Sequence, residues 1–145
     1  MTDTRHKSIA YTLFFFSGVL SLMFQVVWLK KLVLVFGNTV WAVSTLLTAF
    51  MAGLALGSWL FGRIADRAES PLKLYGFLEG VIGVYGLLTL WIFAKLPILY
   101  IPLYRLSGGD TALMGVFKFL LGFCILLPPT MCMGGTLPLL ARRFT

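Results

Sequence analysis

The chain has 145 residues, of which 59% are hydrophobic and only 12% are charged. Soluble domains contain about 25% charged residues and no more than about 50% apolar ones, so this composition excludes an ordinary soluble globular domain. The formal net charge of +7 does not indicate a nucleic-acid-binding protein, because the basic residues flank apolar runs, as they do at the ends of membrane spans.

Four apolar runs predict an all-α membrane protein with four transmembrane helices. We expect residues 1–8 to form a polar cytoplasmic tail and residues 9–145 to form a single transmembrane domain. The two central runs, 39–61 and 72–93, are each long enough to cross a bilayer, which takes about 20 apolar residues. A short charged turn at 62–71 is expected to join them.

The first span is expected at about Ile9–Trp28. It is too long for the apolar core of a signal peptide and is therefore interpreted as a span. Trp28 is expected at the membrane–water interface, where tryptophan is enriched, and Lys30 and Lys31 mark the boundary with water. Residues 32–36 either extend this helix or lie along the membrane surface.

Both central spans carry glycines about one helical turn apart. Gly53 and Gly57 form such a face in the second span, and Gly76, Gly80 and Gly83 form another in the third. Because small residues let helix backbones approach closely, we expect both faces to be helix-packing surfaces. A pore-lining role for the first face is the alternative.

Glu79 is the only acidic residue placed well inside a predicted span. It lies roughly 10 Å from the charged turn, at about 1.5 Å per helical residue. Ionisable groups inside a membrane are costly and indicate function by default. The hypotheses are a site for a cation such as a polyamine, or a structural carboxyl group that is protonated or hydrogen-bonded. Lys118 is expected too near the opposite face for a direct ion pair.

Prolines disturb the last third of the chain. Residues 94–111 contain Pro97 and Pro102, which disfavour a regular long helix, so we predict a short interfacial segment on the membrane surface. Pro128 and Pro129 interrupt the fourth apolar stretch and predict a kinked fourth helix. A helix break that lines a binding site is the alternative.

The distribution of basic residues predicts the orientation in the membrane, because Lys and Arg are enriched in cytoplasmic loops. Seven basic residues fall on one predicted side and four on the other: Arg5, Lys7, Arg63, Arg67, Lys73, Arg142 and Arg143 against Lys30, Lys31, Lys95 and Arg105. We therefore expect a multi-pass protein of the cell inner (plasma) membrane with both termini in the cytoplasm.

The segment Gly62-Arg63-Ile64-Ala65-Asp66-Arg67 resembles the Gly-x-Leu-Ala-Asp-Arg loop between the second and third helices of major facilitator transporters. The resemblance implies a facilitator-like partial bundle. It also implies that Gly62, Asp66 and Arg67 are structural loop residues, with Asp66 and Arg67 tying the turn to neighbouring helix ends. The family's next glycine and its basic pair are replaced by Glu69, Ser70 and Pro71.

A wider resemblance covers nearly the whole chain. Its segments look like the membrane region of multi-pass spermidine-synthase-like proteins: Phe24–Trp28, Ala49–Ser58, Pro71–Gly76, Glu79 and Met133–Arg142. In that family a facilitator-like membrane domain precedes a cytoplasmic domain of aminopropyltransferase fold.

The chemistry of such a catalytic domain is not found in this sequence. Gly108-Gly109-Asp110 mimics part of a nucleotide-binding loop, but no buried strand precedes it. The sequence contains no Ser/His/Asp set, Cys/His pair or metal-ligand cluster. We therefore predict no catalytic residue, no metal and no cofactor, and we do not expect enzyme activity in this chain.

Three functional hypotheses remain. The first is a membrane accessory or scaffold module that binds other membrane helices, in a complex with other subunits or by self-association within the lipid bilayer. The second is a small transporter or polyamine-handling half-unit with Glu79 as its cation site. The third is a fragment of a membrane-bound aminopropyltransferase that lacks its catalytic domain. No nucleic-acid partner is expected.

Overall fold

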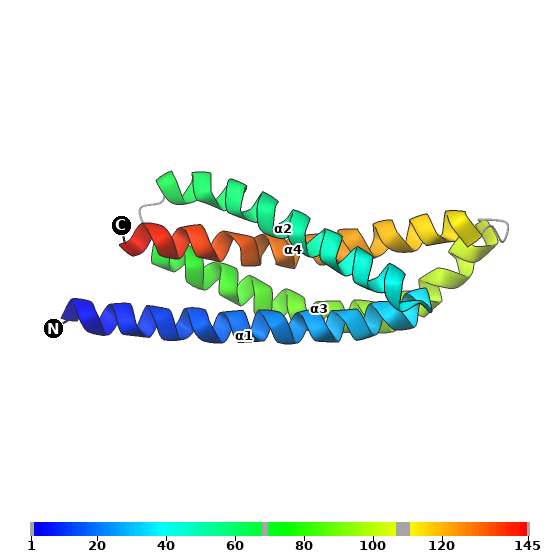
Figure 1. Cartoon of the computed structure of the whole chain (residues 1–145), viewed down its shortest axis with the longest axis horizontal. Helices are drawn as coiled ribbons and strands as arrows, with labels where there is room; N and C mark the ends of the chain where they lie inside the picture. Colours follow the sequence, from blue (N-terminus) through cyan, green and yellow to red (C-terminus); the bar gives the residue numbers. More distant parts are fainter. Residues whose placement is uncertain (1, 68–69, 107–110, 145) are drawn as a thin grey trace.

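Four long helices make up the bundle. The computed structural model of the chain describes residues 2–67, 70–106 and 111–144. The helices are α1 (Thr2–Phe36), α2 (Thr39–Arg67), α3 (Pro71–Leu106) and α4 (Thr111–Phe144). All four are long and apolar enough to cross a membrane. The predicted all-α fold is confirmed, and the helices run lengthwise in an elongated bundle whose two chain ends lie together (Figure 1).

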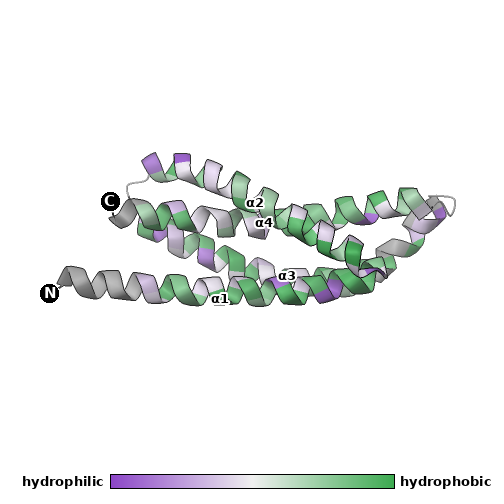
Figure 2. Ribbon diagram, in the orientation of Figure 1, coloured by the Kyte–Doolittle hydropathy of each residue, from purple (hydrophilic) through white to green (hydrophobic). Residues whose placement is uncertain are grey.

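Much of the outside of the bundle is apolar. Hydrophobic residues cover the middle of every helix, and the polar residues gather towards the two ends of the bundle (Figure 2). Each helix exposes large apolar side chains, such as Phe15, Trp59, Phe77 and Val116. Helices that are apolar all round belong in lipid or in the core of a large protein. The four helices therefore fit a multi-pass membrane protein.

The order of the helices in space differs from their order in the sequence. The most extensive contact joins α2 to α4, while α3 packs mainly on α4 and α1 mainly on α2. The sequence neighbours α2 and α3 are not among the well-packed pairs. α4 is thus the central helix of the bundle, and its side chains meet all three other helices.

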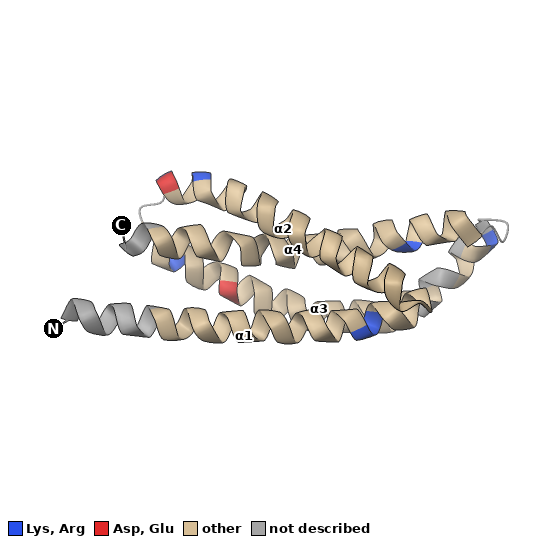
Figure 3. Ribbon diagram, in the orientation of Figure 1, with Lys and Arg blue, Asp and Glu red and all other residues tan. Residues whose placement is uncertain are grey.

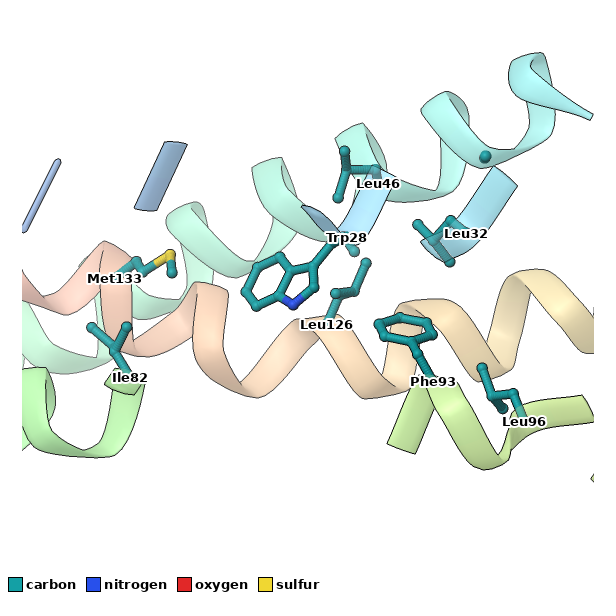
Figure 4. Close-up of a cluster of buried hydrophobic side chains, with 10 residues drawn as sticks. Trp28, Leu32, Leu46, Ile82, Phe93, Leu96, Leu126 and Met133 are labelled. Atoms are coloured by element: carbon teal, nitrogen blue, oxygen red, sulfur yellow. The ribbon is translucent and has the colours of Figure 1, made fainter. Parts of the chain in front are cut away.

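The main core is built around Trp28, which has no exposed surface (Figure 4). Leu46 of α2, Phe93 of α3 and Leu126 of α4 belong to the same buried cluster. The indole Nε1 of Trp28 donates a hydrogen bond to Thr89 Oγ1 at 2.8 Å. The expectation of an interfacial Trp28 is wrong, because a partner inside the bundle satisfies the N–H group that would otherwise favour water.

Several predicted boundaries shift because the helices are longer than expected. Residues 2–8, predicted as a tail, continue α1, and residues 32–36 also belong to this helix. Leu32, only 1% exposed, contributes to the core. The predicted charged turn at 62–71 is mostly helical as well, because α2 ends at Arg67 and α3 begins at Pro71. Proline suits a first helical position, where its missing N–H has no partner to lose.

The interfacial segment predicted at 94–111 is instead largely part of α3, which continues to Leu106. The expectation that the prolines prevent a long helix here is wrong, because it applied the cost of proline in water; the place of this segment at the membrane surface stays a prediction. In a membrane protein the remaining backbone hydrogen bonds have no competing water, and neighbouring groups can satisfy those that proline frees. The helix turns towards the start of α4 in this region (Figure 1). The glycine pair at 108–109 and Asp110 lie outside the described residues.

α4 is one continuous helix through Pro128, Pro129 and Pro138, so the predicted break is absent; the kink stays a prediction. A proline at 138 has no N–H to bond the carbonyl of Gly134, four residues earlier. Ser58 of α2 donates a hydrogen bond to that carbonyl at 2.9 Å. A neighbouring helix thus replaces the donor that Pro138 lacks, which explains how α4 stays helical there.

Candidate functional site

Glu79 lies in a polar cluster between α3 and α1. Its side chain is half-buried, and its Oε1 accepts a hydrogen bond of 2.5 Å from Ser17 Oγ of α1. The carboxyl group lies about 12 Å along the axis from the start of α3 at Pro71. A bond of this kind joins two helices at a depth where few groups compete for it.

Tyr75 lies one helical turn before Glu79 on the same face of α3. Only 6% of Tyr75 is exposed, and its hydroxyl has no hydrogen-bond partner among the described residues. The hydroxyl lies beside the Glu79 carboxylate and Ser17. It does not have the geometry of a hydrogen bond to either of them. Leaving a buried hydroxyl unsatisfied costs about 1–3 kcal/mol, so this group is placed to accept or donate a bond to something that enters the cluster.

The cluster offers a carboxylate and two hydroxyls, which are hard oxygen ligands suited to an ammonium group or a proton. Within the described ranges no group of three or more His, Cys, Asp or Glu residues is close enough to hold a metal ion. From the sequence, Lys118 was predicted to lie too far from Glu79 for an ion pair. In the structure it lines cavities with Lys31, Phe36 and Trp41 at the other end of the bundle.

The two predicted glycine faces lie in very different surroundings. A Cβ atom added at Gly53 would lie less than 3.0 Å from the Thr130 side chain, and one at Gly57 would lie equally close to the backbone of Met131. Both glycines therefore bring α2 against α4. By contrast, a Cβ at Gly76, Gly80 or Gly83 would meet nothing within 4 Å in the described part of the chain. Within the described residues, the glycines of this second face make no close helix contact.

Three close-packed glycines were missed in the sequence: Gly86 of α3, and Gly134 and Gly135 of α4, which meet Leu54 and Phe61 of α2. A Cβ atom at Gly86 would lie less than 3.0 Å from the ring of Phe24, which itself stacks on Trp28 with ring centroids 5.6 Å apart. Thr89, which accepts the Trp28 bond, donates to the Gly86 carbonyl at 2.6 Å. The sequence did contain a signal for Gly86, because it follows Gly83 by three residues and so extends the row of glycines by about one helical turn.

The loop residues implied by the facilitator resemblance lie at the end of α2. Asp66 and Arg67 are exposed in its last turn, and Gly62 is half-buried with nothing within 4 Å of an added Cβ in the part that the structure describes. The guanidinium of Arg63 lies 4.0 Å from the ring centroid of Trp59. Residues 68–69 lie outside the described ranges, so the tie from this turn to neighbouring helix ends stays a prediction.

Comparisons of the chain with protein families, with curated proteins and with solved structures found no match. The resemblances to facilitators and to spermidine-synthase-like proteins therefore stay predictions.

Proposed function

We propose that this chain is an integral membrane module that binds another membrane helix on the glycine face of α3, as an accessory or scaffold subunit or by self-association. The observation that supports the proposal is the exposure of Gly76, Gly80 and Gly83 on one face of a membrane-spanning helix. The same chain uses Gly53 and Gly57 to bring α2 and α4 into contact.

Glycine has no evident use on a face that meets only lipid. It contributes little apolar surface, and it lowers helix propensity by about 1 kcal/mol relative to alanine in water. At a helix–helix contact, by contrast, it removes the side chain that would hold two backbones apart. Exposed glycines at this spacing therefore favour an approaching helix over lipid.

The proposal is tested by disulfide cross-linking in membranes. Cys124 and Cys132 are replaced by alanine, and a single cysteine is placed either at Gly80 or at Phe15. Phe15 is exposed on α1 and lies at a similar depth, because Ser17 of the same helix bonds to Glu79. Mild oxidation should give a covalent dimer from position 80 and little from position 15. Equal cross-linking at the two positions would indicate random collision and contradict a specific face.

A partner of different sequence would leave the chain monomeric in this assay. The same two positions then carry a photo-cross-linking residue in native membranes. Position 80 should give a discrete adduct that the additional change Gly76→Leu removes, while position 15 should give none. No dimer and no adduct at position 80 would refute helix binding by this face.

A second function is a cation site of the kind needed by a polyamine-handling half-unit. It is favoured by the buried hydroxyl of Tyr75 beside Glu79, which has no hydrogen-bond partner among the described residues. Equilibrium binding of labelled spermidine should be saturable in the wild type and lost in Glu79→Gln. Asp66→Asn, which removes an exposed carboxylate, should bind as the wild type does. Without saturable binding to the wild type, this second function is eliminated.

A further inference from the structure

The carboxyl group of Glu79 has no basic partner among the described residues. The hydrogen bond that it accepts comes from the neutral hydroxyl of Ser17. It lies inside α3, apart from the Lys and Arg residues of the described segments (Figure 3). Lys73, the nearest basic residue of the same helix, lies six residues closer to the start of α3, which is about 9 Å along the axis. Since ionisable groups inside a membrane usually pair with one another, this carboxyl group calls for a base from outside the described bundle.

Tyr75 adds a second polar group that lacks a partner. Its side chain is only 6% exposed, and its hydroxyl beside Glu79 has no hydrogen-bond partner among the described residues. Buried polar groups in proteins are nearly always hydrogen-bonded. Lys and Arg side chains carry several N–H donors and no acceptor. A basic group that enters this cluster would therefore satisfy the hydroxyl and the carboxylate together.

The open glycine face of α3 leads directly to this cluster. Gly76 lies three residues before Glu79 and Gly83 lies four residues after it, so both flank the carboxyl group on the helix surface. A Cβ atom at either glycine would meet nothing within 4 Å in the described part of the chain. Glu79 itself is half-buried and can still be reached. A helix that packs on these glycines would bring its own side chains beside the carboxyl group.

We propose that the glycine face of α3 binds a transmembrane helix of another protein, and that this helix carries a lysine or arginine inside its span that pairs with Glu79. The inference rests on the proposed binding of a helix by this face, and it assigns the carboxylate to that helix instead of a free amine. A second copy of this chain does not supply the base. Two copies paired through this same face would place a second Glu79 at this depth, with Lys73 of α3 about 9 Å away along the axis. Of the two cross-linking outcomes above, the inference therefore selects the partner of different sequence.

The first test adds Glu79→Gln to the chain that carries the photo-cross-linking residue at position 80 in native membranes. Glutamine keeps an acceptor for Ser17 but has no charge. The adduct should therefore fall by about fivefold, the equivalent of about 1 kcal/mol for one polar contact between helices. The matched control Asp66→Asn removes an exposed carboxylate at the end of α2 and should leave the adduct unchanged.

The outcomes of this test separate the pairing from helix binding itself. An adduct of full intensity in Glu79→Gln, or equal falls in Glu79→Gln and Asp66→Asn, would overturn the pairing and leave helix binding intact. No adduct in the chain that keeps Glu79 would refute helix binding, and the pairing with it. A disulfide dimer from position 80 would identify a second copy as the occupant, which upholds helix binding and overturns the basic partner.

Mass spectrometry of the adduct then identifies the segment that is bound. It should be an apolar span with a lysine or arginine at the depth of Glu79. Replacing this base by methionine in the partner should lower the adduct as Glu79→Gln does, and the two changes together should lower it no further. A partner span without lysine or arginine, or additive losses, would overturn the pairing.

A synthetic peptide tests the same pairing without the native partner. The purified chain with the photo-cross-linking residue at position 80 is placed in phosphatidylcholine vesicles with an apolar helix of about 20 Ala and Leu residues. The peptide carries one lysine about 12 Å from its end, or methionine at the same position. The lysine peptide should give about fivefold more adduct than the methionine peptide, and Glu79→Gln should abolish the difference. Equal adducts from the two peptides would overturn recognition of a basic residue.

Discussion

The glycine faces of α2 and α3 use the same residue at nearly the same spacing, yet among the described residues only the α2 face is filled, that is, packed against another helix. Gly53 and Gly57 lie against Thr130 and the backbone of Met131, where no Cβ atom would fit. The α3 face has open space at every glycine in the described part of the chain. The difference teaches that glycine spacing predicts where a helix can approach, while the partner depends on the arrangement of the other helices.

The filled face also combines close approach with polar bonds, which the open face lacks within the described chain. At the α2–α4 contact, Thr130 Oγ1 lies 3.3 Å from the Ala49 carbonyl and 2.8 Å from that of Leu126, and Ser58 bonds to the Gly134 carbonyl. α4 brings its own glycine to this contact, since a Cβ at Gly134 would lie within 3.0 Å of the Leu54 backbone. Substitutions can separate the contribution of close backbone approach from that of the inter-helix hydrogen bonds.

The largest effect is expected for Gly57→Leu. Its side chain would meet the Met131 carbonyl, and a backbone group in a helix cannot turn aside as a flexible side chain does. We expect a destabilisation of about 3 kcal/mol or more, at the upper end of overpacking costs. Thermal unfolding and the yield of monodisperse protein in detergent measure it. A Gly57→Leu variant with wild-type stability would show that the α2–α4 contact is not as close as described.

A smaller loss is expected where α3 meets α1. Glu79→Leu leaves the Ser17 hydroxyl without its acceptor and should destabilise the bundle by about 1–2 kcal/mol. Glu79→Gln keeps an acceptor oxygen and should change stability by less than about 0.5 kcal/mol. Unfolding of both variants in the same detergent tests the pair. Equal losses for Leu and Gln would mean that charge, rather than the hydrogen bond, holds the two helices together.

Ser58→Ala should cost about 0.6 kcal/mol, and at most about 1.7 kcal/mol, the range of inter-helix hydrogen bonds in a membrane protein. The loss arises because the Gly134 carbonyl then has no donor from Ser58 and none from position 138. In a Pro138→Ala background the helix regains its own N–H donor, so the cost of Ser58→Ala should shrink. A double-mutant cycle of unfolding free energies measures this coupling. Additive losses would contradict the proposed replacement of the proline's missing donor.

The smallest effect is expected for Gly80→Leu, the counterpart of Gly57→Leu on the open face. Nothing in the described chain lies within 4 Å of its added Cβ, so the unfolding free energy of the dilute protein in detergent should stay within about 0.5 kcal/mol of the wild type. Cross-linking in membranes from a single cysteine at Gly83, on the same face, should nevertheless fall. A Gly80→Leu variant as unstable as Gly57→Leu would show that α3 uses this face inside its own bundle.

The candidate site could be predicted only in part. Glu79 stands out in the sequence because a single carboxyl group inside an apolar run is conspicuous, and Tyr75 could have been added from its four-residue spacing. Ser17 could not, because nothing local places that residue of α1 beside α3. The cavity around Lys31 and Lys118 was missed for the same reason, since its lining comes from helices far apart in the sequence.

The sequence by itself determined the four membrane-spanning helices, because length and apolarity are local properties of a segment. It failed at 94–106, where the cost of proline was judged as in water, although the backbone bonds of a membrane helix have no water to compete with them. Only the tertiary structure decided that α4 lies between α2 and α3, that Trp28 is buried, and which glycine face is filled. Each of these depends on contacts between distant segments, which no local pattern specifies.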